Sequence, residues 1–299
     1  PIHNEIEFEN DVCSHLEAQG WQVSLNDTGY DRERALFPED VFAWIKETQP
    51  KAWEKFADHH GANAEAEFLK RLAKVLEEEG TLGVLRNGFK AVGAGGAEFR
   101  MVQFRPAHGL NPDIEERYRA NRLRVVRQVH YSTKNQNSID LVLFLNGLPV
   151  ATIEVKTQFT QSIEDAKAQY RNDRDPKNEP LLTFKRGALV HFALSTEEIA
   201  MTTRLAGSKT FFLPFNKGNQ RKAGNPPNPN GYDTHYLWDE ILVPEMWLRI
   251  LGSFIQLERK REKQPDGKFI TKETMIFPRY HQLSAVNQLV ALQEGRRGP

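Results

Sequence analysis

The segment between Asp140 and Lys156 constrains the fold of this chain more than any other. An apolar run at residues 141–145 is followed by Asn146-Gly147, and a second apolar run leads to Glu154-Val155-Lys156. An Asn-Gly pair between two apolar runs is the strongest short signal for a β-hairpin. The sequence therefore predicts two antiparallel strands joined by a tight turn here.

Helical and strand patterns alternate along the rest of the chain. Amphipathic periodicity predicts a helix over residues 5–19, ended by Gly20, and helical segments over 38–79 with an interruption near Gly61. Further strands and helices are expected at the following ranges: 21–23, 99–104, 188–194, 199–203 and 210–215 for strands, and 161–171 and 238–258 for helices. This mixture predicts an α/β fold with a mixed central β-sheet flanked by helices.

The sequence from residue 216 onward differs from the rest in composition. Residues 216–230 are rich in Asn, Pro, Gly and basic side chains, as expected of a long loop. Residues 259–272 are highly charged and contain Pro265-Asp266-Gly267, which suggests a linker. A helix begins near Arg279 with little sequence beyond it to pack against, as in a truncated chain. We therefore expect one domain over 1–260, and over 261–299 a linker with the start of another domain.

Composition narrows the setting in which the protein works. The 299 residues include 40 basic and 40 acidic side chains, so bulk charge does not indicate a protein that coats nucleic acid, although a local basic groove remains compatible. A single cysteine, Cys13, cannot form an internal disulfide, which fits a reducing cytoplasm. No apolar run reaches the roughly 20 residues of a membrane helix, so we expect no membrane association.

The predicted hairpin carries three charged residues that are unusual in such apolar strands. Acidic-x-Lys occurs five times in the chain, but only Glu154-Val155-Lys156 lies within an apolar strand. A regular two-residue turn pairs Asp140 with Ile153 and puts Asp140 and Glu154 on opposite faces, whereas a longer connection or a bulge pairs Asp140 with Glu154. We predict the second register, with the apolar neighbours pointing into packed layers.

Two carboxylates and an ammonium on one face of a hairpin fit metal-assisted phosphate chemistry. Mg²⁺ takes one or two carboxylates and fills the rest of its octahedron with waters and phosphate oxygens. In that arrangement Lys156 would orient or deprotonate a water, or stabilise charge on the phosphate. The structural alternative is a solvent-facing ion pair, worth at most about 1 kcal/mol.

These three residues resemble the PD-(D/E)-x-K nuclease motif, and their surroundings resemble the N-terminal region of type I restriction enzyme R (motor and endonuclease) subunits. The resemblance covers nearly the whole chain and rests on these stretches: residues 99–106, 127–132, the hairpin, 169–174 and 211–216. It implies a restriction-endonuclease-like core with helical additions, Mg²⁺ held by Asp140 and Glu154, and a cleavage centre completed by Lys156.

The chain departs from the family pattern at two points. The proline of the motif name is absent, because Ile139 precedes Asp140. Related nucleases carry Gln-x-x-x-Tyr on the following helix, whereas Tyr170 here follows Ala166 at that spacing and has Gln169 beside it. Supporting roles for Gln169 and Tyr170, at the site or on DNA, therefore stay open.

Three further groups of residues are candidates. Related nucleases place a glutamate about eleven residues before a Gly-aromatic pair, and Glu9 stands at that distance from Gly20-Trp21, although an exposed helix acid fits the sequence equally well. Gln282 lies in a partial match to the adenine-reading Q motif of helicase motors, whose phosphate loop does not follow. Residues 261–299 would then be a linker and the truncated start of a helicase-like motor domain after a nuclease domain over 1–260, and ATP would be used only by the missing part of that motor. The densest basic run, over residues 117–127, is expected either to contact DNA phosphates or to form a solvated face. From it we single out Arg122, Arg124 and Arg127 as candidates for DNA contact.

The resemblance implies a Mg²⁺-dependent endonuclease that cleaves double-stranded DNA within a complex containing methyltransferase and specificity subunits. Two alternatives remain: a non-catalytic DNA-binding or assembly module of that complex, and a free-standing nuclease of the same fold. The intact Asp140, Glu154 and Lys156 weigh against the first. The sequence identifies neither the recognised DNA site nor whether this chain cuts alone.

Overall fold

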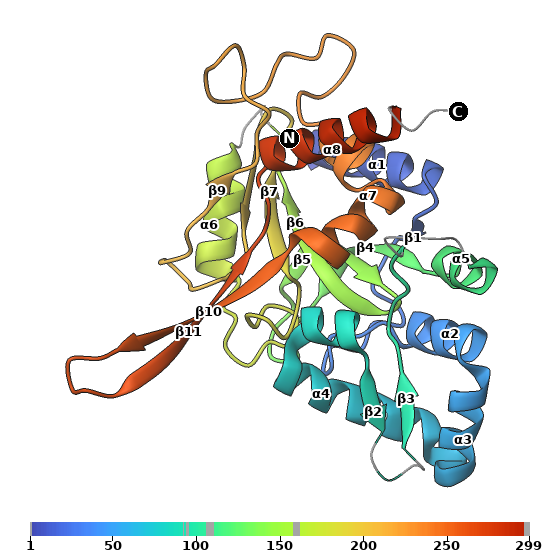
Figure 1. Cartoon of the computed structure of the whole chain (residues 1–299). Coiled ribbons are helices and arrows are strands. Elements are labelled where there is room, and N and C mark those ends of the chain that lie inside the picture. The colour runs from blue at the N-terminus through green and yellow to red at the C-terminus, as the bar shows by residue number, and fades with distance from the viewer. Residues whose placement is uncertain (1, 92, 94–95, 106–110, 158–161, 296–299) are drawn as a thin grey trace.

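A seven-stranded mixed β-sheet forms the centre of the protein (Figure 1). The computed structural model describes residues 2–91, 93, 96–105, 111–157 and 162–295. The sheet order is β1-β4-β5-β6-β7-β8-β9, with β1 parallel to β4, β6 parallel to β7, and antiparallel pairing elsewhere. The strands are β1 (Gln22–Ser24), β4 (Leu123–His130), β5 (Ser138–Leu145), β6 (Leu148–Val155), β7 (Val190–Leu194), β8 (Ile199–Thr202) and β9 (Leu213–Pro214). The predicted α/β class with a mixed sheet is confirmed.

Apolar side chains cover both faces of this sheet. Leu141, Leu143, Ile153 and Val155 point into the larger core, with side chains of α1 (Ile2–Ala18), α2 (Pro38–Thr48), α4 (Ala64–Asn87) and α7 (Pro244–Arg249). Val142 points to the other face, which α6 (Ile163–Asp173) covers. Strands buried on both faces explain why β5 and β6 are almost continuously apolar in sequence.

The β5–β6 hairpin has a tight turn and a bulge. Asn146 and Gly147 have φ of 49° and 83°, and Leu145 pairs with Leu148 across them. Phe144 then pairs with Pro149 but Leu143 with Ala151, so Val150 is an extra residue in β6. A bulge of this kind shifts the register by one residue. The predicted register is confirmed through its bulge alternative, with a two-residue turn retained.

Gly147 is required at this turn by its surroundings as well as by its backbone. A Cβ atom there would lie 2.6 Å from the Phe37 carbonyl oxygen and 2.8 Å from the Val41 nitrogen. The Gly147 carbonyl also accepts a hydrogen bond of 2.9 Å from the Phe37 N–H. The turn of the hairpin is thereby fixed against the start of α2.

A helical addition packs beside the sheet. It consists of α2, α3 (Pro50–His60), the short η1 (Gly61–Asn63), α4 and a small hairpin, β2 (Phe89–Ala91) with β3 (Ala97–Phe99). Aromatic rings hold it together through edge-to-face contacts, as between Phe56 and Phe68 at 5.6 Å and between Phe68 and Phe99 at 4.9 Å. The predicted interruption near Gly61 is confirmed. The strand expected over residues 99–104 is wrong, because β3 covers Ala97–Phe99 and the backbone of Arg100 bonds to the Gln49 side chain instead of to a neighbouring strand.

Two expectations for the C-terminal part differ from the structure. The single helix expected over residues 238–258 is divided into the π-helical η2 (Leu237–Ile241), α7 and the π-helical η3 (Ile250–Phe254), and Pro244 begins α7 because proline is accommodated at a helix start. The segment 259–272 is no irregular linker, since β10 (Gln256–Lys263) and β11 (Phe269–Ile276) pair as an antiparallel ribbon. The chain continues into α8 (Tyr280–Gly295), and the division at residue 260 stays a prediction.

Candidate functional site

The bulge brings Asp140 and Glu154 onto one face of the β5–β6 hairpin. Leu141 pairs with Ile153, so the next position along the ladder sets Asp140 against Glu154. The Oδ2 atom of Asp140 accepts a 2.8 Å hydrogen bond from the Val155 N–H. Asp140 is 8% exposed and Glu154 is fully buried. Two carboxyl groups therefore lie together in a largely dry environment.

Glu154 is bonded through one oxygen only. Arg174, which follows α6, donates from Nε to Oε1 at 2.6 Å. Within the described part of the chain Oε2 is buried with no hydrogen-bond partner. Burial raises the pKa of Glu154 well above its usual range, and Asp140 raises it further, while Arg174 opposes both. A proton shared with Asp140 would satisfy Oε2, but with both carboxyls ionised the atom is left for a cation.

Lys156 follows the end of β6 and remains cationic. Its N–H donates to the Leu194 carbonyl at 2.8 Å, and its Nζ donates to Glu5 Oε1 at 2.9 Å. Burial lowers the pKa of Lys156, but the attraction of Asp140 and the bond to Glu5 outweigh burial, and the pKa is raised overall. In this state the side chain supplies positive charge and is a poor proton acceptor.

The structure also brings Glu9 to the site. Phe8, Val12 and Leu16 form the buried stripe of α1, and Glu9 lies beside them at 3% exposure. Its Oε1 accepts a 2.7 Å bond from Arg127. Burial raises the pKa of Glu9, Arg127 opposes this, and Asp140 adds to it. The bland interpretation of Glu9 as an exposed helix acid is therefore wrong, although its functional role stays a prediction.

Gln128 connects Glu9 to Asp140. Its Nε2 donates to Asp140 Oδ1 at 3.3 Å and lies 3.4 Å from Glu9 Oε2. Gln128 stands opposite Asp140 in the β4–β5 ladder, where the regular pairing is interrupted, and its φ is 49°. A left-handed backbone is unfavourable for glutamine. That conformation aims its amide at the two carboxylates.

Tyr170 and Gln169 lie on α6 behind the site. The Tyr170 hydroxyl is 2.8 Å from Thr152 Oγ1, which is 2.7 Å from Nδ1 of His191. All three residues are buried, and burial lowers the pKa of His191 to about 3. Tyr170 thus braces β6, whereas Gln169 has an Oε1 atom that is buried without a partner among the described residues. Their roles remain predictions.

The three arginines singled out for DNA all form ion pairs with carboxylates of the protein, two of them with buried carboxylates. Arg124 forms an ion pair with Asp40 at 2.6 Å and is 11% exposed, and Arg127 is bonded to Glu9. Arg122 lies 3.7 Å from Glu47. Gln282 accepts a 2.8 Å bond from the Arg279 N–H in the first turn of α8. None of these contacts supports the predicted DNA or nucleotide roles, which stay predictions.

Sequence reasoning missed three residues of the site: Glu5, Gln128 and Arg174. Arg174 closes the stretch 169–174 that carries the family resemblance, and Glu5 is one helical turn before Glu9. Both signals were available. Gln128 was not accessible, because its orientation depends on a left-handed backbone inside a strand.

The carboxylates of Asp140 and Glu154 suit a hard cation whose other ligands are waters and substrate oxygens. Within the described ranges no three His, Cys, Asp or Glu side chains are grouped to hold a metal. Two carboxylates with one unpartnered buried oxygen match Mg²⁺, which keeps waters and substrate oxygens in its shell. Among the described residues no histidines and cysteines are grouped with these carboxylates as a zinc site would require.

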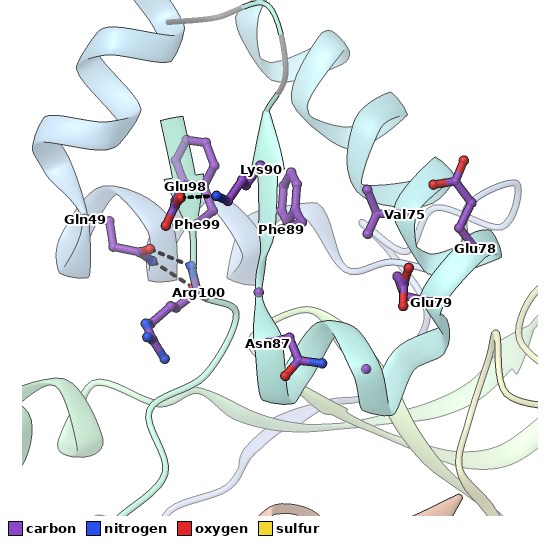
Figure 2. Close-up of a pocket in the computed structure, with 12 residues that line it drawn as sticks. Gln49, Val75, Glu78, Glu79, Asn87, Phe89, Lys90, Glu98, Phe99 and Arg100 are labelled. Carbon is purple, nitrogen blue, oxygen red and sulfur yellow. Dashed lines mark hydrogen bonds and ion pairs between the residues drawn. The ribbon is translucent and has the colours of Figure 1, made fainter. Parts of the chain in front are cut away.

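A cavity lies away from the hairpin, in the helical addition. This pocket of about 590 Å³ is lined by residues of α4, β2 and β3 and by Gln49 (Figure 2). Lys90 and Glu98 form a 2.8 Å ion pair at its surface, and Gln49 is bonded to the backbone of Arg100. None of the residues around Asp140 lines it. We therefore place the candidate chemistry at the hairpin, where the carboxylates converge.

Comparison with known protein families identifies the family to which the chain belongs. The family model described as type I restriction enzyme R protein N terminus matches residues 2–210, which include every strand from β1 to β8 and all the residues of the site. No curated protein matches the chain. Within the described residues no helix is long and apolar enough to cross a membrane.

Proposed function

The chain belongs to the family of type I restriction enzyme R protein N termini, and from that premise we propose that it is a Mg²⁺-dependent endonuclease domain that cleaves double-stranded DNA. Asp140 and Glu154 would hold the metal, and Lys156 would complete the cleavage centre. When bound, Mg²⁺ lowers the pKa of a water and offsets charge on a phosphate.

The observation that carries this proposal is the unpartnered Oε2 of Glu154. A buried polar atom without a partner costs about 1–3 kcal/mol, and more for a charged group. That cost is spared if a cation occupies the space between Glu154 and Asp140. A purely structural ion pair has no reason to leave this oxygen unbonded, which argues against the solvent-facing salt bridge.

The other residues have separate tasks in this scheme. Arg174 fixes Oε1 of Glu154, which leaves Oε2 as the oxygen that could bind a cation. Lys156, held cationic by Asp140 and Glu5, stabilises negative charge that develops on the phosphate. Gln128 and the Val155 N–H each bond one oxygen of Asp140 and restrict its rotation.

Membership of the family supports a proposal about where this activity takes place. We propose that the chain works in the cytoplasm within a type I restriction complex, together with methyltransferase and specificity subunits. Recognition of the DNA site would belong to the specificity subunit, and ATP hydrolysis to a motor domain outside this chain.

Plasmid cleavage by the assembled complex tests the proposal. We expect Asp140→Ala and Glu154→Ala to lower the cleavage rate roughly a thousandfold or more, the several kcal/mol that a catalytic metal contributes. Lys156→Ala should be nearly as severe. ATP hydrolysis should persist in all three, and Glu98→Ala, an exposed acid at the remote cavity, should cut like the parent. Parent-like cleavage by any of the three site variants would mean that the site is misplaced.

Metal binding gives a second readout that does not depend on activity. Titration calorimetry with Mn²⁺, in the presence of a short duplex, should show binding to the parent chain and to Glu98→Ala. Glu154→Ala should lose this binding while retaining its circular dichroism spectrum. Undiminished Mn²⁺ binding by Glu154→Ala would remove Glu154 from the metal site.

A further inference from the structure

The ribbon formed by β10 and β11 projects away from the central sheet (Figure 1). Eight cross-strand pairs run from Gln256 with Ile276 to Lys263 with Phe269. Strands of eight residues span about 27 Å. Its base is fixed to the body, because Thr203 donates to the Met275 carbonyl at 2.7 Å and Arg204 to the Glu273 carbonyl at 2.8 Å. The ribbon is therefore an arm with a defined direction.

The two faces of this arm differ in charge. Alternate residues of a strand share a face, and directly paired residues lie on the same side. One face, which we call the basic face, carries three cations, Arg259, Arg261 and Lys263, against the single carboxylate of Glu273. The opposite face carries two cations against two carboxylates: Lys260 and Lys272 with Glu258 and Glu262. Positive charge is thus segregated to one side.

The charge on the basic face is available to a ligand. Glu273 is already neutralised, because Arg259 lies 2.9 Å and Lys185 3.3 Å from its carboxylate. Arg261 and Lys263 are exposed and have no ion-pair partner within the described part of the chain. This contrasts with Arg124 and Arg127, whose guanidinium groups are bonded inside the protein.

An aromatic ring pre-orients one of these cations. The guanidinium of Arg261 lies 4.3 Å from the centroid of the Phe269 ring, and Phe269 is 54% exposed. Stacking on an aromatic face reduces the conformational freedom that an arginine loses on binding. The arrangement keeps a planar cation presented to solvent at the end of the arm.

We propose that the basic face of the β10–β11 ribbon contacts the phosphate backbone of duplex DNA. This inference rests on the proposed function, since it assumes that the substrate is DNA. A two-stranded ribbon is narrow enough to enter a major groove about 12 Å wide. Regularly spaced cations along one face of a strand suit a polyanion. Contacts to phosphate alone carry no sequence preference.

Binding of a short duplex to the chain, followed by fluorescence anisotropy over a range of salt, tests this proposal. The test variant carries both Arg261→Gln and Lys263→Gln. The matched control carries both Lys260→Gln and Lys272→Gln, and it removes the same charge from the opposite face. The first pair should weaken binding about tenfold at 0.1 M salt and reduce the salt slope by about 1.8, two phosphate contacts at 0.9 each. The control pair should change both quantities by less than a third of that.

Equal losses in the two pairs would overturn the proposal, because bulk charge would then explain the binding. Parent-like binding by both pairs would also overturn it, and failure of the first pair to enter the restriction complex would then identify a protein-docking arm. A second measurement needs no variant: DNA should protect Lys263 of the parent chain from acetylation and leave Lys260 reactive. Equal protection of both lysines would contradict the proposal.

These outcomes are separable from those of the nuclease proposal. Asp140→Ala should lose cleavage in the complex and keep both the DNA affinity and the salt slope. If Asp140→Ala still cleaved, the nuclease site would be wrong while the ribbon data stood. If the ribbon variants bound normally while Asp140→Ala was inactive, the ribbon proposal alone would fail.

Discussion

Two buried arginine–carboxylate pairs on the same sheet are built differently. At the β1 edge Arg124 binds both oxygens of Asp40, at 2.6 and 2.8 Å. Its remaining donors reach Ser24 at 2.9 Å and Gln22 at 2.7 Å, and its guanidinium lies 4.3 Å from the Phe37 ring centroid. Every part of this pair has a partner.

At the hairpin the corresponding pair is incomplete. Arg174 binds Oε1 of Glu154 at 2.6 Å and the Ser138 carbonyl at 2.6 Å, while Oε2 of Glu154 has no hydrogen-bond partner in the described structure. Asp140 adds a second negative charge nearby. The complete pair of Arg124 and Asp40 stabilises the fold. The incomplete pair of Arg174 and Glu154 leaves one carboxylate oxygen for a bound cation.

The largest expected difference between the two pairs is in stability. Asp40→Asn leaves Arg124 with only the exposed Glu39 carboxylate, 3.7 Å away, as a countercharge, so the free energy of unfolding should fall by about 3 kcal/mol. Glu154→Gln also removes the countercharge of Arg174, but it relieves the repulsion between Glu154 and Asp140, so the loss should be smaller, about 1–2 kcal/mol. Urea unfolding of both variants measures this, and equal losses would erase the distinction between the pairs.

The buried network behind the site provides a test through pH. Burial lowers the pKa of His191 to about 3, below the usual value near 6.5, so below pH 6.5 the unfolded chain binds a proton that the folded protein does not. Stability should therefore fall as the pH drops, by about 2 kcal/mol between pH 7 and pH 5 from this group. His191→Gln should remove that part of the pH dependence, and exposed His15→Gln should not. Identical pH profiles for parent and His191→Gln would show that His191 does not stay neutral.

The smallest expected effect concerns the residue that orients Asp140. Gln128→Asn keeps a side chain that tolerates the left-handed backbone but shortens its reach to Asp140 and Glu9. We expect Mn²⁺ affinity to fall about tenfold, as for other residues that orient metal ligands, with little change in stability. Gln220→Asn is the matched control, since Gln220 also has a positive φ, 46°, but is exposed and remote. Unchanged affinity in Gln128→Asn would remove Gln128 from the site.

The parts of the fold set by local patterning were predictable. Asn146-Gly147 identified the hairpin, and the shared face of Asp140 and Glu154 followed from the bulge that a metal site there requires. The ribbon at residues 256–276 was not anticipated, because its strands are charged and lack the apolar alternation that indicates a half-buried strand. Pro265-Asp266-Gly267 was the available turn signal, and without apolar flanks it suggested a linker.

Partners distant in sequence were the main obstacle at the site. Glu154 is bonded to a residue 20 positions away, and Arg124 to one 84 positions away. A basic run gives no indication that its members point inward to Asp40 and Glu9. For the same reason the sequence did not identify the cations of the ribbon as candidates for DNA contact, although these cations, unlike Arg124 and Arg127, are exposed to solvent.

The single extra residue in β6 has a consequence for parity. Thirteen residues lie between Asp140 and Glu154, and across a regular two-residue turn two residues with an odd number between them are not paired and lie on different faces of the hairpin. Val150 reverses that rule, so the two carboxylates meet only because one strand counts one residue more than its partner. Deleting or duplicating a residue anywhere between the two carboxylates inverts the parity again. Adding or removing one residue in this hairpin therefore moves one of the two carboxylates to the other face of the sheet, whatever the identity of that residue.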